Sequence, residues 1–210
     1  MTIEAVIFDM DGTLLDSTRT VPPAYAAAIY ELSGVRCTDE QVIAEYEVGP
    51  AAALLSRFIG RDAVDADVDC WLRHLASRAS MTVIYPGVRG ALEQLSSAGI
   101  QLGVFTGATR QAAQLQLDHA DLASWFNVVV GSDEIDAVKP APDGIYRACE
   151  LLNVDPRNAA YVGDATNDLR CAHAAGAIPV AAAWGHLYEP DPSVQFVANG
   201  PAHLIEVLGL

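Results

Sequence analysis

The chain alternates short apolar runs with segments of helical length, and this alternation restricts the folds that it can adopt. Five runs are rich in apolar residues; they span 3–8, 101–105, 127–130, 159–162 and 178–183. Helix-length segments separate or follow them at 87–98, 107–118, 141–152, 165–175 and 201–208. Continuous apolar strands in such an alternation are typical of a parallel sheet that helices cover on both faces. We therefore predict an α/β fold.

The alternation is interrupted between Ser17 and about Met81, where the sequence shows no convincing strand. We predict a Rossmann-like core domain formed by residues 1–16 and 84–210, and an inserted, all-helical cap domain at 17–83. Four helices are expected in this insertion: after Pro22-Pro23, from the capping box that Thr38 begins, after Gly49-Pro50, and from about Asp62.

Composition argues against several classes of protein. Of the 210 residues, 51% are apolar and 19% are charged, so a folded chain is expected. The net charge of −15 argues against nucleic acid as a partner, because binding to phosphates needs a basic surface. The apolar runs are far shorter than the roughly 20 residues of a membrane span, and no signal-peptide pattern is present. We expect a soluble, cytoplasmic protein without a membrane partner, and leave its oligomeric state open.

The cysteines and histidines show no spacing that is typical of a metal site. No two cysteines form a CxxC pair, and the five histidines lack an HExxH pattern. We therefore expect neither structural zinc nor disulfides, and predict reduced, buried thiols at Cys37, Cys70, Cys149 and Cys171.

Two acidic residues follow the first apolar run at the point where a strand would end. Asp9 and Asp11 flank Met10, and alternate residues of an extended segment point the same way. In a parallel α/β sheet, reactive groups collect at the carboxyl ends of the strands. Two carboxylates that face one spot repel each other unless a proton or a cation lies between them. The pair therefore favours a divalent metal ion, which would also neutralise an anionic substrate on so acidic a protein.

Further polar residues stand at the ends of the other predicted strands. Thr106 and Gly107 end the second run and are expected to open a helix, where a hydroxyl and free N–H groups suit a phosphate oxygen. Lys139 precedes a proline, which favours a conformation from which its ammonium group can project into a cleft. Asp164 and Asp168 are expected on one face of the following helix, near its N-terminus. Together these residues supply the groups that phosphoryl transfer through a carboxylate nucleophile needs.

Four motifs occur in order along the chain: DMDGTLLDS at 9–17, FTG at 105–107, VKPAPDG at 138–144 and GDATND at 163–168. On these motifs the chain resembles the haloacid dehalogenase-like hydrolase superfamily, over essentially its whole length. The helical insertion is similar to the small cap that this family inserts after its first motif. The part from Pro86 to Gly185 most resembles the phosphoglycolate phosphatase-like branch, and so does the turn AAWGH at 182–186.

The resemblance implies a reaction. Asp9 would attack phosphorus and form an aspartyl-phosphate, while Asp11 would protonate the leaving oxygen and then activate water. The substrate would be a small phosphorylated metabolite, a monoester such as phosphoglycolate. The ligands implied for Mg²⁺ are Asp9, the main-chain carbonyl of Asp11, Asp164 and, through water or by orienting the other ligands, Asp168; those implied for the phosphoryl oxygens are Thr106, the Gly107 N–H and Lys139.

Other functions remain open at this point. Halogen-displacing relatives lack an acid at the position of Asp11, and phosphonate-cleaving relatives use a cap lysine that 17–83 does not contain. The alternatives are a sugar-phosphate mutase of the same superfamily, which returns the phosphoryl group to a sugar, and a non-catalytic phosphate-binding or regulatory protein. Arg57 in the insertion, and Arg110 and His186 on the core side, are candidates for contacting the rest of the substrate.

Overall fold

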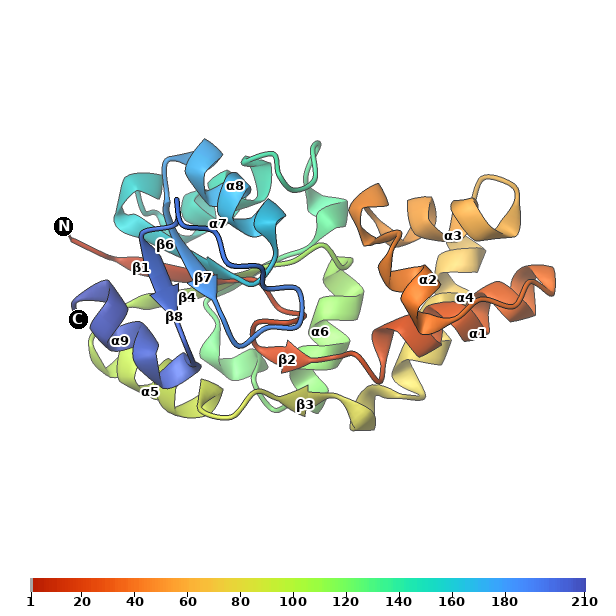
Figure 1. The fold of residues 1–210 in the computed structure, drawn as a ribbon, viewed down its shortest axis with the longest axis horizontal. Coiled ribbons are helices and arrows are strands. Elements are labelled where there is room, and N and C mark those ends of the chain that lie inside the picture. The colour runs from red at the N-terminus through yellow and green to blue at the C-terminus, as the bar shows by residue number, and fades with distance from the viewer. Residues whose placement is uncertain (1) are drawn as a thin grey trace.

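A computed structural model describes residues 2–210 and contains a six-stranded parallel sheet. The strand order is β5-β4-β1-β6-β7-β8, and every neighbouring pair is parallel (Figure 1). This arrangement confirms the predicted α/β fold. The strands are β1 (Ala5–Phe8), β4 (Gln101–Phe105), β5 (Val128–Val130), β6 (Ala159–Gly163), β7 (Ile178–Ala182) and β8 (Phe196–Ala198).

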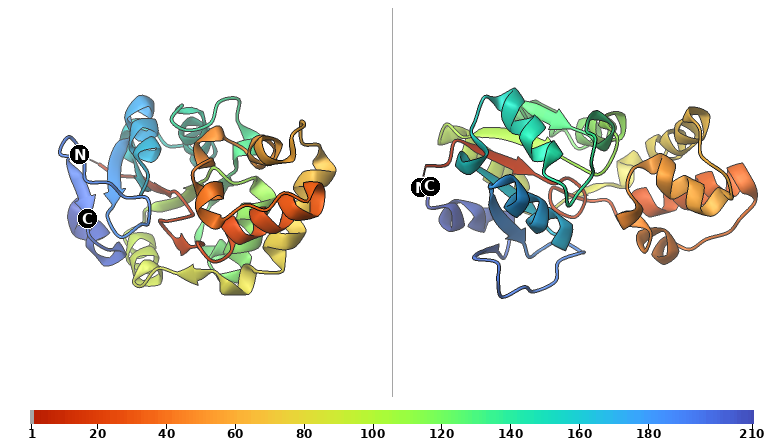
Figure 2. Two further views of the ribbon diagram at one scale, coloured as in Figure 1. Left: turned by 45° about the vertical axis from the view of Figure 1, so that its right-hand side comes forward. Right: turned by 90° about the horizontal axis from the view of Figure 1, so that it is seen from above.

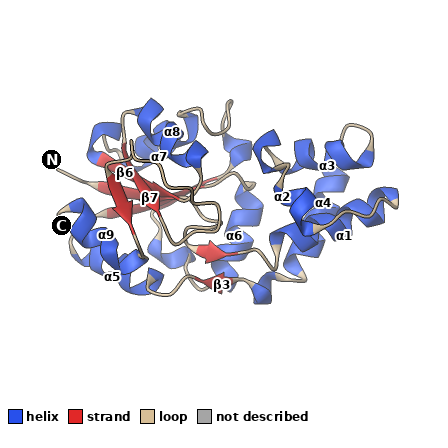
Figure 3. Ribbon diagram, in the orientation of Figure 1, coloured by secondary structure: helices blue, strands red, loops and turns tan. Residues whose placement is uncertain are grey.

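Helices cover both faces of the sheet, as its apolar strands require (Figure 3). One face packs against α5, α6 and α9 in an apolar cluster, and the other face packs against α7 and α8 in a second cluster. The sheet therefore has a separate core on each side. These helices are α5 (Val88–Ser97), α6 (Arg110–His119), α7 (Asp143–Leu152), α8 (Thr166–Ala175) and α9 (Leu204–Leu208).

The remaining helices lie together at the end of the molecule opposite the two chain termini (Figures 1 and 2). They bury a third apolar cluster of their own, to which Ala112 of α6 also contributes. The short antiparallel pair of β2 (Leu15–Asp16) and β3 (Val83–Ile84) joins them to the sheet. The helices are α1 (Val21–Ser33), α2 (Asp39–Ile43), α3 (Ala51–Ile59) and α4 (Asp65–Ala76).

Local sequence signals explain where these helices begin and end. α1 has prolines in its first turn, where a missing N–H is harmless, and it ends at Gly34 with a left-handed φ of 73°. The predicted capping box at α2 is confirmed, because the Thr38 N–H donates to Gln41 and the Thr38 hydroxyl accepts from the Gln41 N–H. Within residues 2–210, no helix is both long and apolar enough to cross a membrane.

Candidate active site

The carboxyl ends of three neighbouring strands meet at one place. β4, β1 and β6 are adjacent and parallel, and they are followed by Thr106, Asp9 and Asp164 respectively. A cavity of about 470 Å³ opens at this edge, and residues of α1, α3 and α4 form its opposite wall. All the candidate residues that belong to the four sequence motifs line this cavity: Asp9, Asp11, Thr106, Gly107, Lys139, Asp164 and Asp168.

Lys139 joins two of the carboxylates. Its Nζ donates to Oδ1 of Asp9 at 2.6 Å and to Oδ1 of Asp168 at 2.7 Å. Burial works to lower the pKa of Lys139, but the attraction of Asp168 and Asp9 outweighs it, so the pKa is raised. Lys139 is the only lysine of the chain, and it remains an ammonium group at neutral pH. It can therefore meet an incoming anion.

The carboxyl groups of the site are buried close to one another, which disfavours their ionised forms. Burial raises the pKa of Asp9 well above its ordinary value; Lys139 opposes this shift, while Asp168 and Asp164 add to it. Burial also raises the pKa of Asp164 to about 6, although the Leu187 N–H donates to its Oδ2 at 2.9 Å. Such shifts arise when carboxylates share a site, and a bound cation reverses them.

The oxygen atoms of this cluster fit a hard metal ion. Carboxylate oxygens of Asp9, Asp164 and Asp168 lie within 4.8 Å of one another. Oδ1 of Asp164 is buried and, among the described residues, has no hydrogen-bond partner. Asp168 differs, because its Oδ1 accepts from Lys139 and its Oδ2 accepts from the Ala165 N–H at 3.0 Å. Asp9 and Asp164 are thus better placed than Asp168 to bind a cation directly.

Glycines allow the chain to pass close to Asp164. Gly12 has φ +89°, and a Cβ on it would lie 2.4 Å from Oδ2 of Asp164. A Cβ on Gly185 would lie 2.2 Å from the Cβ of Asp164 and 2.4 Å from the Gly12 carbonyl oxygen. A hydrogen bond joins the two segments that contain these glycines, since Nε1 of Trp184 donates to the carbonyl oxygen of Thr13 at 2.9 Å. Any larger residue at these glycines would displace the Asp164 carboxylate.

Asp11 is suited to carry a proton. Burial of its carboxyl group raises the pKa of Asp11, while Ser17 opposes this shift. Its Oδ1 is buried and has no hydrogen-bond partner within the described residues. A carboxylic acid with a raised pKa can donate a proton near neutral pH and take it back afterwards.

Comparison with known proteins places this site in a family. The haloacid dehalogenase-like hydrolase family matches residues 6–183. The chain belongs to this family. Among curated relatives of this hydrolase, a phosphoglycolate phosphatase of Neisseria meningitidis is 32% identical over 193 residues, which covers 88% of this chain and 82% of the relative. Another, from Chromobacterium violaceum, is 30% identical over 218 residues, which covers 98% and 96% of the two chains. The family resemblance predicted from the motifs is confirmed.

A solved structure shows the same fold. CbbY from Rhodobacter sphaeroides, determined in complex with phosphate, superposes on this hydrolase with a TM-score of 0.85. The two chains are 22% identical, and the match covers 100% of each. At this identity the likeness supports the fold and leaves the substrate of this hydrolase to be argued from its own residues.

Two local predictions for this hydrolase were wrong. Thr106 and Gly107 do not open α6, which begins at Arg110 with Thr109 as its N-cap, because both belong to the four-residue loop 106–109 between β4 and α6. The Thr106 hydroxyl instead accepts from the Ala108 N–H at 3.1 Å within that loop. Asp164 does not lie on α8 with Asp168 either; it precedes the helix, and Asp168 alone caps the helix from its first turn.

Of the three candidates outside the motifs, one lines the cavity and two do not. His186 lines the cavity, as expected of a residue that borders the site. Arg57 pairs with Glu45 at 3.1 Å and has a side chain that is 62% exposed, and it is not among the lining residues. Arg110 donates to the carbonyl oxygen of Val129 and does not line the cavity either. Neither arginine therefore supports the suggested substrate contact.

Sequence reasoning missed several residues of the opposite wall. Tyr25, Tyr46 and Trp71 come from the helical group, and Gln116 comes from α6. Trp71 stacks on Tyr25 with ring centroids 4.7 Å apart. Each residue sits in a helical pattern that is equally consistent with an ordinary core position. Only the packing of the helices above the sheet brings these side chains to the cavity.

Proposed function

We propose that this hydrolase is a Mg²⁺-dependent phosphatase that acts on a small organic phosphate monoester through an aspartyl-phosphate at Asp9. The observation that carries the proposal is the convergence of Asp9, Asp11, Lys139 and Asp164 on one cavity. The phosphoglycolate phosphatases among its relatives support this chemistry and make a phosphoglycolate-like monoester the first substrate to test. We place this activity in the cytoplasm.

Asp9 is the nucleophile in this proposal. Its carboxylate is ionised with the help of Lys139, whose ammonium group donates to it at 2.6 Å. An oxygen of Asp9 attacks phosphorus, the ester bond to the leaving alcohol breaks, and a covalent aspartyl-phosphate forms. This divides one difficult hydrolysis into two easier displacements.

Asp11 transfers the proton in both displacements. Its protonated carboxyl group, favoured by burial, gives a proton to the leaving alcohol oxygen in the first step. The resulting carboxylate takes a proton from the water that hydrolyses the aspartyl-phosphate in the second step. Asp11 thereby returns to its starting state, and such acid–base action contributes about 10²–10⁴-fold to the rate.

The remaining candidates bind the metal and the phosphoryl group. Mg²⁺, when bound, supplies positive charge that offsets the carboxylates and the transferring phosphoryl oxygens. Asp9, the main-chain carbonyl of Asp11 and Asp164 would hold it, with Asp168 acting mainly by fixing Lys139. Thr106, the Gly107 N–H and Lys139 would hold phosphoryl oxygens, and each donor of this kind is worth roughly 3–4 kcal/mol in the transition state.

Residues 17–83 act as a cap domain in this proposal, with residues 1–16 and 84–210 forming the catalytic core. The wall that α1, α3 and α4 contribute to the cavity supports this division. A cap over the phosphoryl site excludes bulk water and contacts the leaving group.

Hydrolysis of p-nitrophenyl phosphate tests the proposed function. The purified chain should turn over this substrate with Mg²⁺ and stop with EDTA, and Asp9→Asn should be inactive while still folded. A folded, Mg²⁺-loaded protein without turnover on any phosphate ester would support a non-catalytic binding role instead. Isomerisation of a sugar 1-phosphate without release of inorganic phosphate would support a mutase.

A further inference from the structure

The described residues with which the helical group lines the cavity are uncharged. The helical group lines it with apolar and aromatic side chains: Val21, Tyr25, Ile43, Tyr46, Leu54 and Trp71. Among the lining residues that the structure describes, Lys139 is the only lysine or arginine, and it is already engaged by Asp9 and Asp168. His186 is exposed and lies 3.4 Å from the Tyr85 hydroxyl.

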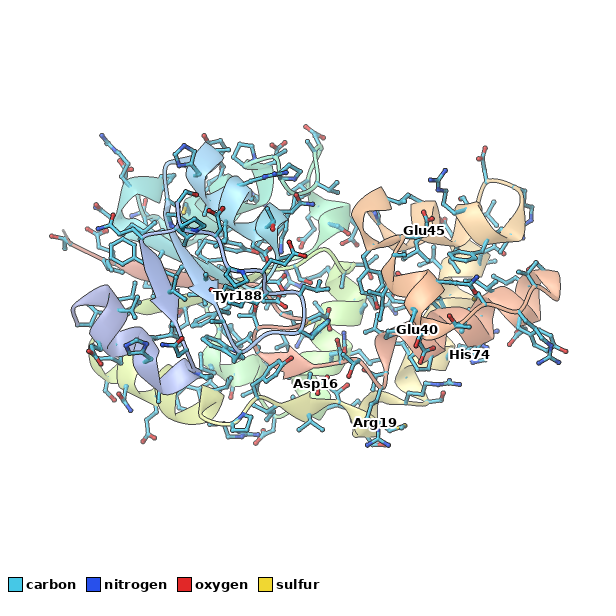
Figure 4. All side chains as sticks on the ribbon, viewed as in Figure 1. Asp16, Arg19, Glu40, Glu45, His74 and Tyr188 are labelled. Atoms are coloured by element: carbon cyan, nitrogen blue, oxygen red, sulfur yellow. The ribbon has the colours of Figure 1, made fainter. Side chains whose placement is uncertain are left out.

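The arginines of residues 17–83 are directed elsewhere. None of the six is among the residues that line the cavity. Arg19 is exposed and lies at the lower edge of the molecule in Figure 4, near the junction of the helical group and the sheet. The others have partners of their own: Arg36 the Tyr30 ring, Arg57 Glu45, Arg61 Asp67, Arg73 Glu31, and Arg78 the His74 carbonyl oxygen.

An additional anionic group on the substrate would therefore meet no lysine or arginine of its own among the described lining residues. Besides the phosphoryl-binding groups, the cavity is lined by four aspartates and by Glu189. A carboxylate or second phosphate that lies against the uncharged wall would lose hydration without gaining a cation as partner, and an unpaired charge in such a place is strongly unfavourable. A phosphoglycolate-like leaving group carries just such a carboxylate.

Two neutral polar side chains in this wall lack partners. Trp71 and Gln116 each have a relative exposure of 1%. The indole N–H of Trp71 and both amide atoms of Gln116 have no close hydrogen-bond partner among the described residues, although the Gln116 side chain lies near enough to Asp11 to lower the pKa of that carboxyl group. Buried polar groups rarely stay unpaired in a functioning complex. The indole can only donate, whereas the amide can donate and accept, so together they match hydroxyl groups.

We propose that this cavity selects a monoester whose alcohol part is uncharged and carries hydroxyl groups beside an apolar face, namely a polyol or sugar monophosphate. The Trp71 N–H and the Gln116 amide bind those hydroxyls, and the Tyr25–Trp71 wall packs against the carbon skeleton. Esters that carry a carboxylate or a second phosphate are disfavoured. This inference rests on the proposed phosphatase function and replaces the phosphoglycolate-like ester with a neutral one as the expected substrate.

Competing substrates test the inference directly. With Mg²⁺, kcat/KM is measured for glycerol 1-phosphate, a hexose 6-phosphate and 2-phosphoglycolate, with p-nitrophenyl phosphate as the measure of basal chemistry. The better neutral ester should exceed 2-phosphoglycolate by at least about tenfold, because leaving a buried charge unpaired costs at least that ratio. Equal rates, or a preference for 2-phosphoglycolate, would overturn the inference and leave the phosphatase proposal intact.

Failure of the phosphatase proposal would show separately, as no turnover of p-nitrophenyl phosphate. In that case the unaltered chain does not consume the esters, and their calorimetric binding to it in the presence of Mg²⁺ decides the inference. The neutral esters should bind at least about tenfold more tightly than 2-phosphoglycolate. The opposite order would refute the inference whatever the chain does catalytically.

A substitution at Trp71 tests whether this residue binds the hydroxyl groups of the substrate. Trp71→Phe keeps the ring and removes the N–H; it should lower kcat/KM for the preferred neutral ester by about tenfold relative to p-nitrophenyl phosphate, which has no hydroxyl to lose. Trp125→Phe, outside the cavity, is the matched control and should leave that ratio unchanged. Gln116→Met provides the same comparison if Trp71→Phe does not fold. An unchanged ratio in the folded cavity variant would overturn the assignment.

Discussion

Replacing Lys139 with methionine should destabilise the protein in a pH-dependent manner. The variant keeps the length of the side chain and removes the ammonium group that donates to Asp9 at 2.6 Å and to Asp168 at 2.7 Å. The side chains of Lys139, Asp9 and Asp168 are 13%, 9% and 3% exposed, so water screens these contacts poorly. Removing one partner of a buried ion pair costs about 3–5 kcal/mol, because the other charge is left uncompensated.

The ionisation of Asp9 decides whether the destabilisation by Lys139→Met grows or shrinks as the pH rises. Burial already raises the pKa of Asp9, and loss of Lys139 removes the main effect that opposes this rise. The destabilisation should therefore be largest at pH 8, where the carboxyl group must ionise, and smaller at pH 5, where it can stay protonated. Urea unfolding of the metal-free protein at both values measures the difference in the free energy of unfolding.

Two controls separate charge from shape. Lys139→Arg retains the positive charge and should be destabilised less than Lys139→Met at pH 8. The double variant Lys139→Met/Asp168→Asn removes one of the two carboxylates that lose their ammonium partner, and it should recover part of the lost stability. A loss below about 1 kcal/mol for Lys139→Met, or an equal loss at both pH values, would refute the reasoning.

Three further predictions concern the other acidic groups. Asp11→Asn should fold and bind Mg²⁺ but lower kcat by about 10²–10⁴-fold in steady-state assays; near-normal turnover would remove Asp11 from proton transfer. Because the pKa of Asp164 is raised to about 6, the metal-free protein should lose stability as pH rises through that value. Because Asp164 takes up a proton as the pH falls, the Mg²⁺ affinity measured by calorimetry should be weaker at pH 5 than at pH 8. An equal affinity at both pH values would contradict this. Gly12→Ala should abolish Mg²⁺ binding, whereas Gly34→Ala, which is also at positive φ but has no atom within 4 Å, should retain it; equal affinities would contradict the crowding of Asp164.

The sequence indicated the sheet and the edge at which the candidate residues meet because both follow from short-range patterns. Apolar runs that stop at polar residues located β1, β4 and β6, and the geometry of parallel strands then brought Asp9, Thr106 and Asp164 together. β8 was not predicted because it has three residues and is only partly buried. β2 and β3 were not predicted because they have two residues each. Such short pairings are set by tertiary contacts.

The opposite wall could not be predicted for a different reason. Whether an arginine such as Arg57 reaches the substrate or pairs with Glu45 depends on how separate helices pack, which no local pattern records. The start of α6 was misplaced because Thr106 and Thr109 are both acceptable N-caps, and only the loop geometry distinguishes them. The division into residues 17–83 and the two core segments stays a prediction.

The most direct test of the central claim is to locate the phosphoryl group on the enzyme. Asp11→Asn is incubated with Mg²⁺ and p-nitrophenyl phosphate, whose leaving group needs little protonation, and is then quenched in acid. Since this variant lacks the base for the second step, it should accumulate phosphate on the peptide that contains Asp9, as found by mass spectrometry, and Asp9→Asn should accumulate none. A phosphoryl group on any other residue, or turnover by Asp9→Asn, would contradict the account.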